Sequence, residues 1–515
     1  MSRLGNQKTL SFEFKVKQAV ERNNNYEEGQ PKTSDRNLEV DRAGVKYKTA
    51  VFSKTMPHNS RGEVLVTDWD KLATAAVEGT EEAFSVVAKG STRKFVNPRS
   101  AHSFYPMGVD AFGATMPAPH EMQSREASSE MLEVYEQALN RDTPFYVLED
   151  LAANTDADRA VASLNAFGVD FLGPKDTGSV TRKTLFRGAA QGCVLGPYIS
   201  QFLYYDVPYG AGVVEQKYNT EAVVSHGTIL ADYLAIQNGD IFNPNLDLTG
   251  NFNYIHDARV LGSYVHRDGA FQAYINAAFI LCLKGAPFDT LNPYIGNDRE
   301  ESFLTHGPVD VLLAVTSVAN VALRAAWCQK WTKHLRMRPE VMACRVHHQD
   351  IVDTDYGLHA DLMSSPTIAA VKAANASGTA LLPLQYPEGS PAHPSYPAGH
   401  AVFSGACITV LKAFFKEETV ITSLFPVLHS ETGASLDAYT GSTTGMTVGT
   451  ELNKLGANIT IGRDWAGVHY RSDGDWGMNL GEKVAIQFLK DLKAGYNEEF
   501  AGWNLTKFDG TVTVI

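Results

Sequence analysis

Residues 329–340 read Gln-Lys-Trp-Thr-Lys-His-Leu-Arg-Met-Arg-Pro-Glu and follow a long apolar stretch. Upstream of them, apolar residues recur at spacings of three and four, the pattern of a helix with one core-facing side. These residues are Leu312, Val315, Ala319, Leu323 and Ala326. Lys330 continues the same face, where a buried ammonium group costs free energy unless an anion compensates it. Pro339 stops the helix after Arg338, so we expect a helix over 307–336. The alternative is an ordinary basic helix C-terminus, which the helix dipole favours.

The second informative segment is His393-Pro-Ser-Tyr-Pro-Ala-Gly-His400, at the end of a long loop. Its prolines favour extended backbone, and Gly399 permits a close approach of the chain to a ligand. His400 opens an apolar helix expected over 401–416, so free backbone amides and the positive end of the helix dipole should face an anion there. The alternative is a turn rich in proline and glycine with a histidine near a helix cap.

The third segment, Gly462-Arg463-Asp-Trp-Ala-Gly-Val-His469-Tyr-Arg-Ser-Asp473, follows a helix expected over 449–461. His469 and Asp473 are four residues apart, so on a helical turn they share a face. A carboxylate in that position can accept the proton of one imidazole nitrogen and leave the other nitrogen free as a ligand. The alternative is a core histidine that a nearby aspartate satisfies.

The chain as a whole has the composition of a globular protein, with 515 residues, 44% hydrophobic and 20% charged. Helical periodicity dominates from about residue 70, and long loops rich in glycine and proline separate the helices, notably 94–120, 188–214 and 378–400. We therefore expect a mainly α fold with little β-structure. Residues 1–60 are polar and irregular, which predicts an extended N-terminal arm, and residues 61–515 form a single helical domain with its active site within 255–490.

The net charge and the apolar content of the chain limit the classes of partner that we expect. The net charge of −13 argues against a nucleic-acid surface. The first residues lack the apolar core of a signal peptide, and we find no run of about 18 apolar residues. A soluble protein without a membrane partner is expected, in a compartment that the sequence does not indicate. The five cysteines match no zinc or redox spacing.

Taken together, the three segments resemble the vanadium-dependent haloperoxidases, which share an active-site architecture with the PAP2-type acid phosphatases. The likeness extends over about 255–490 and is closest to the algal and cyanobacterial bromoperoxidases. Like those proteins, this chain has seven residues between Lys330 and Arg338. The resemblance implies helical bundles of the vanadium haloperoxidase type.

Vanadate (orthovanadate) is the cofactor that the resemblance implies. Its oxygens would be bound by Lys330, Arg338, Arg463 and the backbone N–H of Gly399. His469 would be the vanadium ligand, oriented by Asp473. One departure is plain: where the family usually has serine, this chain has Ala398. Loss of the corresponding hydrogen bond should cost about 1–3 kcal/mol of local stabilisation.

The same resemblance assigns catalytic groups. Lys330 would also polarise the bound peroxide. His400 would be the acid–base histidine, and His393 a second histidine near the site. Asp268 would pair with His400, although it could instead cap the helix that follows it. Trp327 matches a position facing the halide region, with a plain core aromatic residue as the alternative.

The implied function is the oxidation of halide, bromide foremost and iodide also, by hydrogen peroxide to a hypohalous species that halogenates a small organic substrate. By analogy with the family, we expect a homodimer or a larger homo-oligomer. One alternative is a PAP2-like phosphohydrolase, with His469 as the nucleophile that forms a phosphohistidine and His400 as the acid for the leaving group. Another is a non-catalytic protein that stores phosphate in the same pocket. The spacing of Lys330 and Arg338 and the chain length favour the peroxidase.

Overall fold

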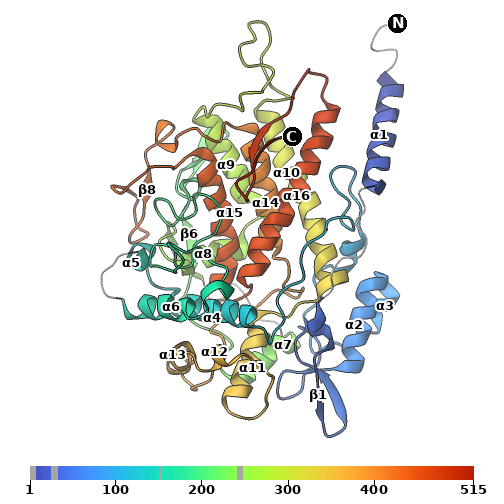
Figure 1. The fold of residues 1–515 in the computed structure, drawn as a ribbon, viewed down its shortest axis with the longest axis vertical. Coiled ribbons are helices and arrows are strands. Elements are labelled where there is room, and N and C mark those ends of the chain that lie inside the picture. Colours follow the sequence, from blue (N-terminus) through green and yellow to red (C-terminus); the bar gives the residue numbers. More distant parts are fainter. Residues whose placement is uncertain (1–6, 25–32, 150–153, 241–247) are drawn as a thin grey trace.

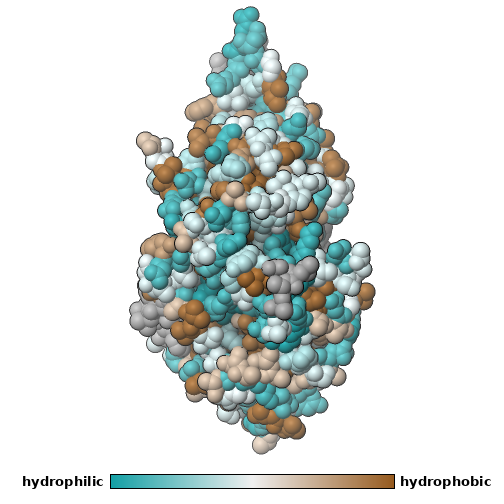
Figure 2. All heavy atoms as spheres, turned by 90° about the vertical axis from the view of Figure 1, so that its left-hand side faces the viewer, coloured by the Kyte–Doolittle hydropathy of each residue, from teal (hydrophilic) through white to brown (hydrophobic). Residues whose placement is uncertain are grey.

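The structure is a computed structural model that describes residues 7–24, 33–149, 154–240 and 248–515 (Figure 1). Helices dominate it, and the described strands form only two- and three-stranded antiparallel sheets, which confirms the mainly α prediction. On the face shown in Figure 2, hydrophilic and hydrophobic residues are interspersed.

The helices and strands have the following bounds. The α-helices are α1 (Gln7–Asn24), α2 (Val66–Glu78), α3 (Glu81–Ser85), α4 (Arg125–Asn140), α5 (Phe145–Glu149), α6 (Thr155–Asn165), α7 (Leu230–Asn238), α8 (Ala258–Arg267), α9 (Gln272–Leu283), α10 (Pro308–Cys328), α11 (Pro339–Asp350), α12 (Ala360–Met363), α13 (Pro366–Ala374), α14 (Gly399–Phe414), α15 (Val448–Trp465) and α16 (Arg471–Gly495). The strands are β1 (Glu39–Arg42), β2 (Val45–Lys48), β3 (Val64–Leu65), β4 (Val207–Tyr209), β5 (Gly212–Val214), β6 (Tyr218–Glu221), β7 (Leu248–Asn253), β8 (Leu428–His429), β9 (Asp437–Ala438), β10 (Asn504–Thr506) and β11 (Val512–Val514).

The centre of the molecule is α14, which packs against α10, α15 and α16 (Figure 1). Apart from His400, all of its residues are buried, as expected of a helix that is apolar on every side. Two glycines let α14 and α16 approach closely. A Cβ added at Gly405 would lie 2.0 Å from the carbonyl oxygen of Met478, and one at Gly481 would lie 2.1 Å from that of Val402. The bundle therefore fixes the start of α14 next to the start of α16.

The helix that carries Lys330 changes geometry before it ends. Residues Gln329–His334 continue α10 as one π-helical stretch, and Leu335 then takes a left-handed conformation (φ 49°). The predicted helix over 307–336 therefore ends slightly early, and Arg338 instead becomes the N-cap of α11, a helix that the sequence analysis did not identify. Lys330 and Arg338, on either side of this turn, both contact the loop before α14, Lys330 at Pro394 and Arg338 at His393.

The segment Pro308–His334 is also long and apolar enough to span a membrane by length and composition, so the expectation that no such stretch exists was wrong. Of its most apolar window, 56% is buried inside the molecule. Packing against α14, α16 and α9 accounts for this apolar character, since core helices of large proteins pass the same test.

The N-terminal region differs from the extended arm predicted over residues 1–60. Residues 7–24 form α1, and β1 and β2 form an antiparallel hairpin. Val51, Phe52 and Met56 are buried in a small core that also contains Trp331 from the π-helical stretch. Apolar side chains that find a partner far along the chain explain this difference. Residues 1–6 and 25–32 of the predicted arm lie outside the described residues, and the domain boundary at residue 60 stays a prediction.

Candidate active site

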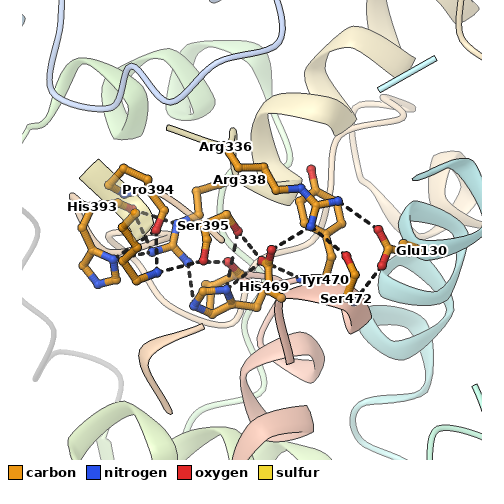
Figure 3. Close-up of polar contacts among 12 residues, drawn as sticks. Glu130, Arg336, Arg338, His393, Pro394, Ser395, His469, Tyr470 and Ser472 are labelled. Atoms are coloured by element: carbon orange, nitrogen blue, oxygen red, sulfur yellow. Dashed lines mark hydrogen bonds and ion pairs between the residues drawn. The ribbon is translucent and has the colours of Figure 1, made fainter. Parts of the chain in front are cut away.

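The three segments singled out in the sequence meet at one buried place (Figure 3). Arg338 lies at its centre. Its Nη1 is 2.9 Å from Nε2 of His469, and its Nη2 is 3.0 Å from Nδ1 of His393. The guanidinium also donates to the backbone carbonyls of His393 and Val468. One arginine thus joins the segment after α10, the loop before α14 and the loop before α16.

His469 is held in one orientation by Asp473. The residue precedes α16, and its Nδ1 lies 2.8 Å from Oδ2 of Asp473 on the first turn of that helix. Because a carboxylate accepts a proton there, Nδ1 carries the hydrogen and Nε2 keeps its lone pair. Burial, together with the nearby charge of Arg338, lowers the pKa of His469 well below its ordinary value. The ring is therefore neutral and offers an unprotonated Nε2.

Asp473 is itself fixed by a network that the sequence analysis missed (Figure 3). Its Oδ1 pairs with Arg336 at 2.7 Å, and its Oδ2 accepts a hydrogen bond from Ser395 Oγ at 2.5 Å. Arg336 also pairs with Glu130 of α4 at 2.9 Å. Burial alone would raise the pKa of Asp473, but Arg336 and the hydrogen bond with His469 hold it below the usual range. Asp473 therefore stays ionised.

Lys330 is fully buried and points at the loop before α14. Its Nζ donates to the backbone carbonyls of Pro394 at 2.7 Å and of Ser395 at 2.8 Å. Burial and the neighbouring Arg338 lower the pKa of Lys330 well below that of an ordinary lysine. Its ammonium form is thus poorly compensated by the protein alone.

Arg463, in the last turn of α15, contributes the third cation. Its Nη1 donates to the carbonyl of Val265 at 2.8 Å and to Tyr386 Oη at 3.3 Å, and its guanidinium lies over the Tyr386 ring. Its Nε is buried without a hydrogen-bond partner in the described part of the chain. A buried N–H without a partner is costly, so an acceptor placed here would be stabilised.

These three cations share one property. Across the described ranges, no carboxylate lies within 4.0 Å of the charged nitrogens of Lys330, Arg338 or Arg463, whereas Arg336 has two such partners. Burial and repulsion by Arg463 lower the pKa of Arg338 to about 9, despite the opposing effect of Asp473. Three buried cations without carboxylate partners, one orphaned N–H and an unprotonated imidazole nitrogen fit a tetrahedral oxyanion such as vanadate or phosphate.

The start of α14 forms another part of the site. Gly399 is its first residue, and Ala398 is its N-cap, without a side-chain hydrogen bond to the helix. The Ala398 N–H donates to the carbonyl of Asp473 at 2.9 Å, which ties this helix start to that of α16. A Cβ added at Gly399 would lie 3.4 Å from the Trp327 ring, which places Trp327 next to the start of α14.

His400 and Asp268 come together as expected, with His400 Nε2 and Asp268 Oδ1 2.9 Å apart. Asp268 follows the end of α8, and Phe271 rather than Asp268 is the N-cap of α9, which removes the capping alternative. The acid–base role of this pair stays a prediction.

Trp327 and His393 lie beside the group formed by Lys330, Arg338 and Arg463, which we call the cation cluster. Their rings are 4.9 Å apart, and the Lys330 Nζ lies 6.0 Å from the centre of the Trp327 ring. Burial and the charges of Lys330 and Arg338 lower the pKa of His393 well below its ordinary value. Trp327 is only partly buried, unlike a plain core aromatic residue, but its contact with halide stays a prediction.

The fold and the cation cluster together define a helical-bundle protein that binds an oxyanion. The family model described as the VCPO second helical-bundle domain matches residues 310–498. A vanadium-dependent bromoperoxidase from Corallina pilulifera is 30% identical over 90% of this chain and 91% of the relative. Another from Ascophyllum nodosum is 32% identical over 90% of this chain and 88% of the relative.

A solved structure also matches the chain. It is that of the homohexameric second vanadate-dependent bromoperoxidase from Ascophyllum nodosum, which matches 98% of this chain and 90% of that one with a TM-score of 0.89 and 25% identity. The chain belongs to the vanadium-dependent bromoperoxidase family, which confirms the resemblance inferred from the three segments.

Proposed function

We propose that this protein is a vanadate-dependent peroxidase that oxidises bromide, and iodide also, with hydrogen peroxide to a hypohalous species. The observation that carries the proposal is the cluster of three buried cations without carboxylate partners beside the unprotonated Nε2 of His469. Vanadate, when bound, supplies a Lewis acid that polarises hydrogen peroxide for attack by halide.

The cations bind the oxyanion and stabilise charge. Lys330, Arg338 and Arg463 donate to its oxygens, and the N–H of Gly399 at the start of α14 donates as well. Because these groups are buried and fixed by the bundle, little reorganisation is needed as charge develops. The ammonium of Lys330 also stabilises the negative charge that forms on the leaving oxygen of the peroxide.

Binding requires one exchange of partners. Nε2 of His469 accepts a hydrogen bond from Nη1 of Arg338 in this structure. To act as the ligand, Nε2 would have to release this donor, and Nη1 would then be free to donate to an oxygen of the anion. Asp473 keeps the ring in the correct tautomer throughout, because its hydrogen bond with Nδ1 is unaffected.

His400 is the residue that transfers protons. Its Nε2–H donates to Asp268, so Nδ1 is the atom that takes a proton from incoming hydrogen peroxide and later returns it to the departing oxygen. His393 is neutral and accepts a hydrogen bond from Arg338, which positions that guanidinium.

A bromination assay tests this function directly. Purified protein is given bromide, hydrogen peroxide and an organic bromine acceptor, with and without added orthovanadate. Bromination that requires orthovanadate is the expected result. Release of phosphate from a monoester, without any bromination after loading with orthovanadate, would contradict the proposal and favour a phosphohydrolase instead.

Changing Ala398 to serine should strengthen vanadate binding. The added hydroxyl lies at the helix start beside Gly399 and can donate one hydrogen bond to an oxygen of the anion. One such bond contributes about 0.5–1.5 kcal/mol, so the dissociation constant should fall about 2- to 13-fold. Equilibrium dialysis against orthovanadate measures it, and equal dissociation constants in the two proteins would show that Ala398 has no effect.

We also propose that the protein forms a homo-oligomer. The structural relative from Ascophyllum nodosum is homohexameric. In this chain, α1 places Phe12, Val16 and Val20 at a spacing of four, and all three are exposed, while Gln18 on the other side of the helix is buried. A second copy of the chain can cover this apolar stripe. Light scattering should give a mass that is a multiple of 56.2 kDa, and a monomer at micromolar concentration would contradict the proposal.

A further inference from the structure

A cavity of about 450 Å³ lies on the outer side of α10, next to the cation cluster. One wall is a single face of α10, because its residues recur at spacings of three and four. They are Thr316, Ala319, Asn320, Leu323, Arg324 and Trp327. The facing walls come from 96–103 and from Ala270 and Phe271, between α8 and α9. This volume is within the range of cavities that hold small organic ligands.

The cavity reaches the site through Trp327. This residue lines the cavity, and its ring lies 4.9 Å from that of His393 and 6.0 Å from Nζ of Lys330. Leu323, also in the lining, and Trp327 are the two side chains nearest to the Cβ position of Gly399. On the other wall, Phe271 is three residues after Asp268, the partner of His400. A molecule in the cavity is therefore beside the cluster of Lys330, Arg338 and Arg463.

Arg324 gives the cavity its chemical character. Its Nε donates to Asn320 at 2.8 Å, and its Nη1 donates to Ser103 Oγ, so the guanidinium is held in place. Within the described ranges, no carboxylate lies within 4.0 Å of the Arg324 guanidinium. Its Nη2 donates no hydrogen bond to any residue of these ranges. Arg324 is one helical turn from Trp327, and its guanidinium lies over the Tyr105 ring. A fixed cation without a carboxylate partner is thus at one end of an otherwise largely apolar lining.

We infer that this cavity binds the organic substrate, and that the substrate is an electron-rich aromatic compound with an anionic group. The inference rests on the proposed function for the supply of hypobromous acid. The anion pairs with the guanidinium of Arg324, and the ring lies against Leu323 and Trp327. There a ring C–H becomes C–Br: bromine arrives as the electrophile of hypobromous acid, whose oxygen leaves with the ring proton as water.

Two phenols of nearly equal size test this inference. 4-Hydroxybenzoate carries a carboxylate at neutral pH, whereas 4-hydroxybenzamide is neutral. In the vanadate-loaded enzyme, Arg324→Met should raise the KM for bromination of 4-hydroxybenzoate about tenfold and leave that for 4-hydroxybenzamide unchanged. Arg324→Lys should restore most of the difference. Arg299→Met, which removes one exposed charge outside the cavity, is the matched control.

Calorimetric titration of 4-hydroxybenzoate into the protein, with orthovanadate present but no bromide or peroxide, separates this inference from the proposed function. Binding that weakens about tenfold in Arg324→Met supports the cavity, even in a preparation that does not brominate. Equal affinities in the wild type and Arg324→Met overturn it. So do bromination rates that never saturate with either phenol, because these indicate that free hypobromous acid reacts in solution.

Discussion

Replacement of His469 by alanine is expected to lower vanadate-dependent bromination by at least about a thousandfold. Nε2 of this residue is the only proposed ligand to vanadium, and its neighbours Arg338 and Lys330 can hold the anion electrostatically but cannot replace that bond. Bromination kinetics at saturating orthovanadate, with equilibrium dialysis for binding, provide the measurement.

His429→Ala is a suitable control for this variant, because His429 is a partly exposed histidine on β8, outside the site. It should retain full activity. The His469 variant should remain folded, since Asp473 keeps its pairing with Arg336 and Ser395. Full bromination by a folded His469→Ala protein would remove the proposed ligand.

Replacement of Asp473 by asparagine is expected to weaken both stability and cofactor binding. The change removes a buried charge from Arg336 and the acceptor that fixes Nδ1 of His469. Breaking a buried ion pair costs about 3–5 kcal/mol, and because Glu130 still pairs with Arg336 we expect about 3 kcal/mol. Loss of the group that orients a metal ligand typically weakens binding 10- to 100-fold.

Urea unfolding of the vanadate-free protein measures the first effect, and equilibrium dialysis the second. The exposed Asp437 on β9 provides a matched control, Asp437→Asn. The pKa of Asp473 is lower in the folded than in the unfolded protein, so its stabilisation is full above the unfolded value of about 3.9 and is lost as the pH falls through the folded value. The free energies of unfolding of the wild type and of Asp473→Asn should therefore differ by the full amount at pH 7 and by less in strong acid. A difference below about 0.5 kcal/mol at pH 7 would contradict this account.

The three site segments could be predicted from sequence because each has a local signal. Lys330 continues an apolar helical face, Gly399 and His400 start an apolar helix, and His469 and Asp473 are separated by one helical turn. Residue type and spacing within a few positions are enough for these inferences.

The network around Asp473 could not be found in this way. Arg336 is part of the basic segment already singled out, but its partner Glu130 is on α4, far away in the sequence. The polar pattern of α4 is typical of a partly exposed helix, yet Glu130, Glu133 and Glu136 are all buried there. Only tertiary packing brings an arginine to each of them: Arg336 to Glu130, Arg471 to Glu133 and the partly buried Arg159 to Glu136.

Helix ends were also uncertain for physical reasons. The π-helical stretch after α10 and the left-handed Leu335 depend on the burial of Trp331 against Phe52 and Phe95. Those contacts join residues near the N-terminus to the middle of the chain. The same contacts explain why the segment around Val51 and Phe52 is part of a core rather than an extended arm.

The most direct measurement is a crystal structure of the vanadate-loaded protein, with anomalous scattering used to locate vanadium. The account predicts a single vanadium within coordination distance of Nε2 of His469, with side-chain nitrogens of Lys330, Arg338 and Arg463 hydrogen-bonded to its oxygens. Vanadium bound elsewhere, or held there without a bond to His469, would contradict it.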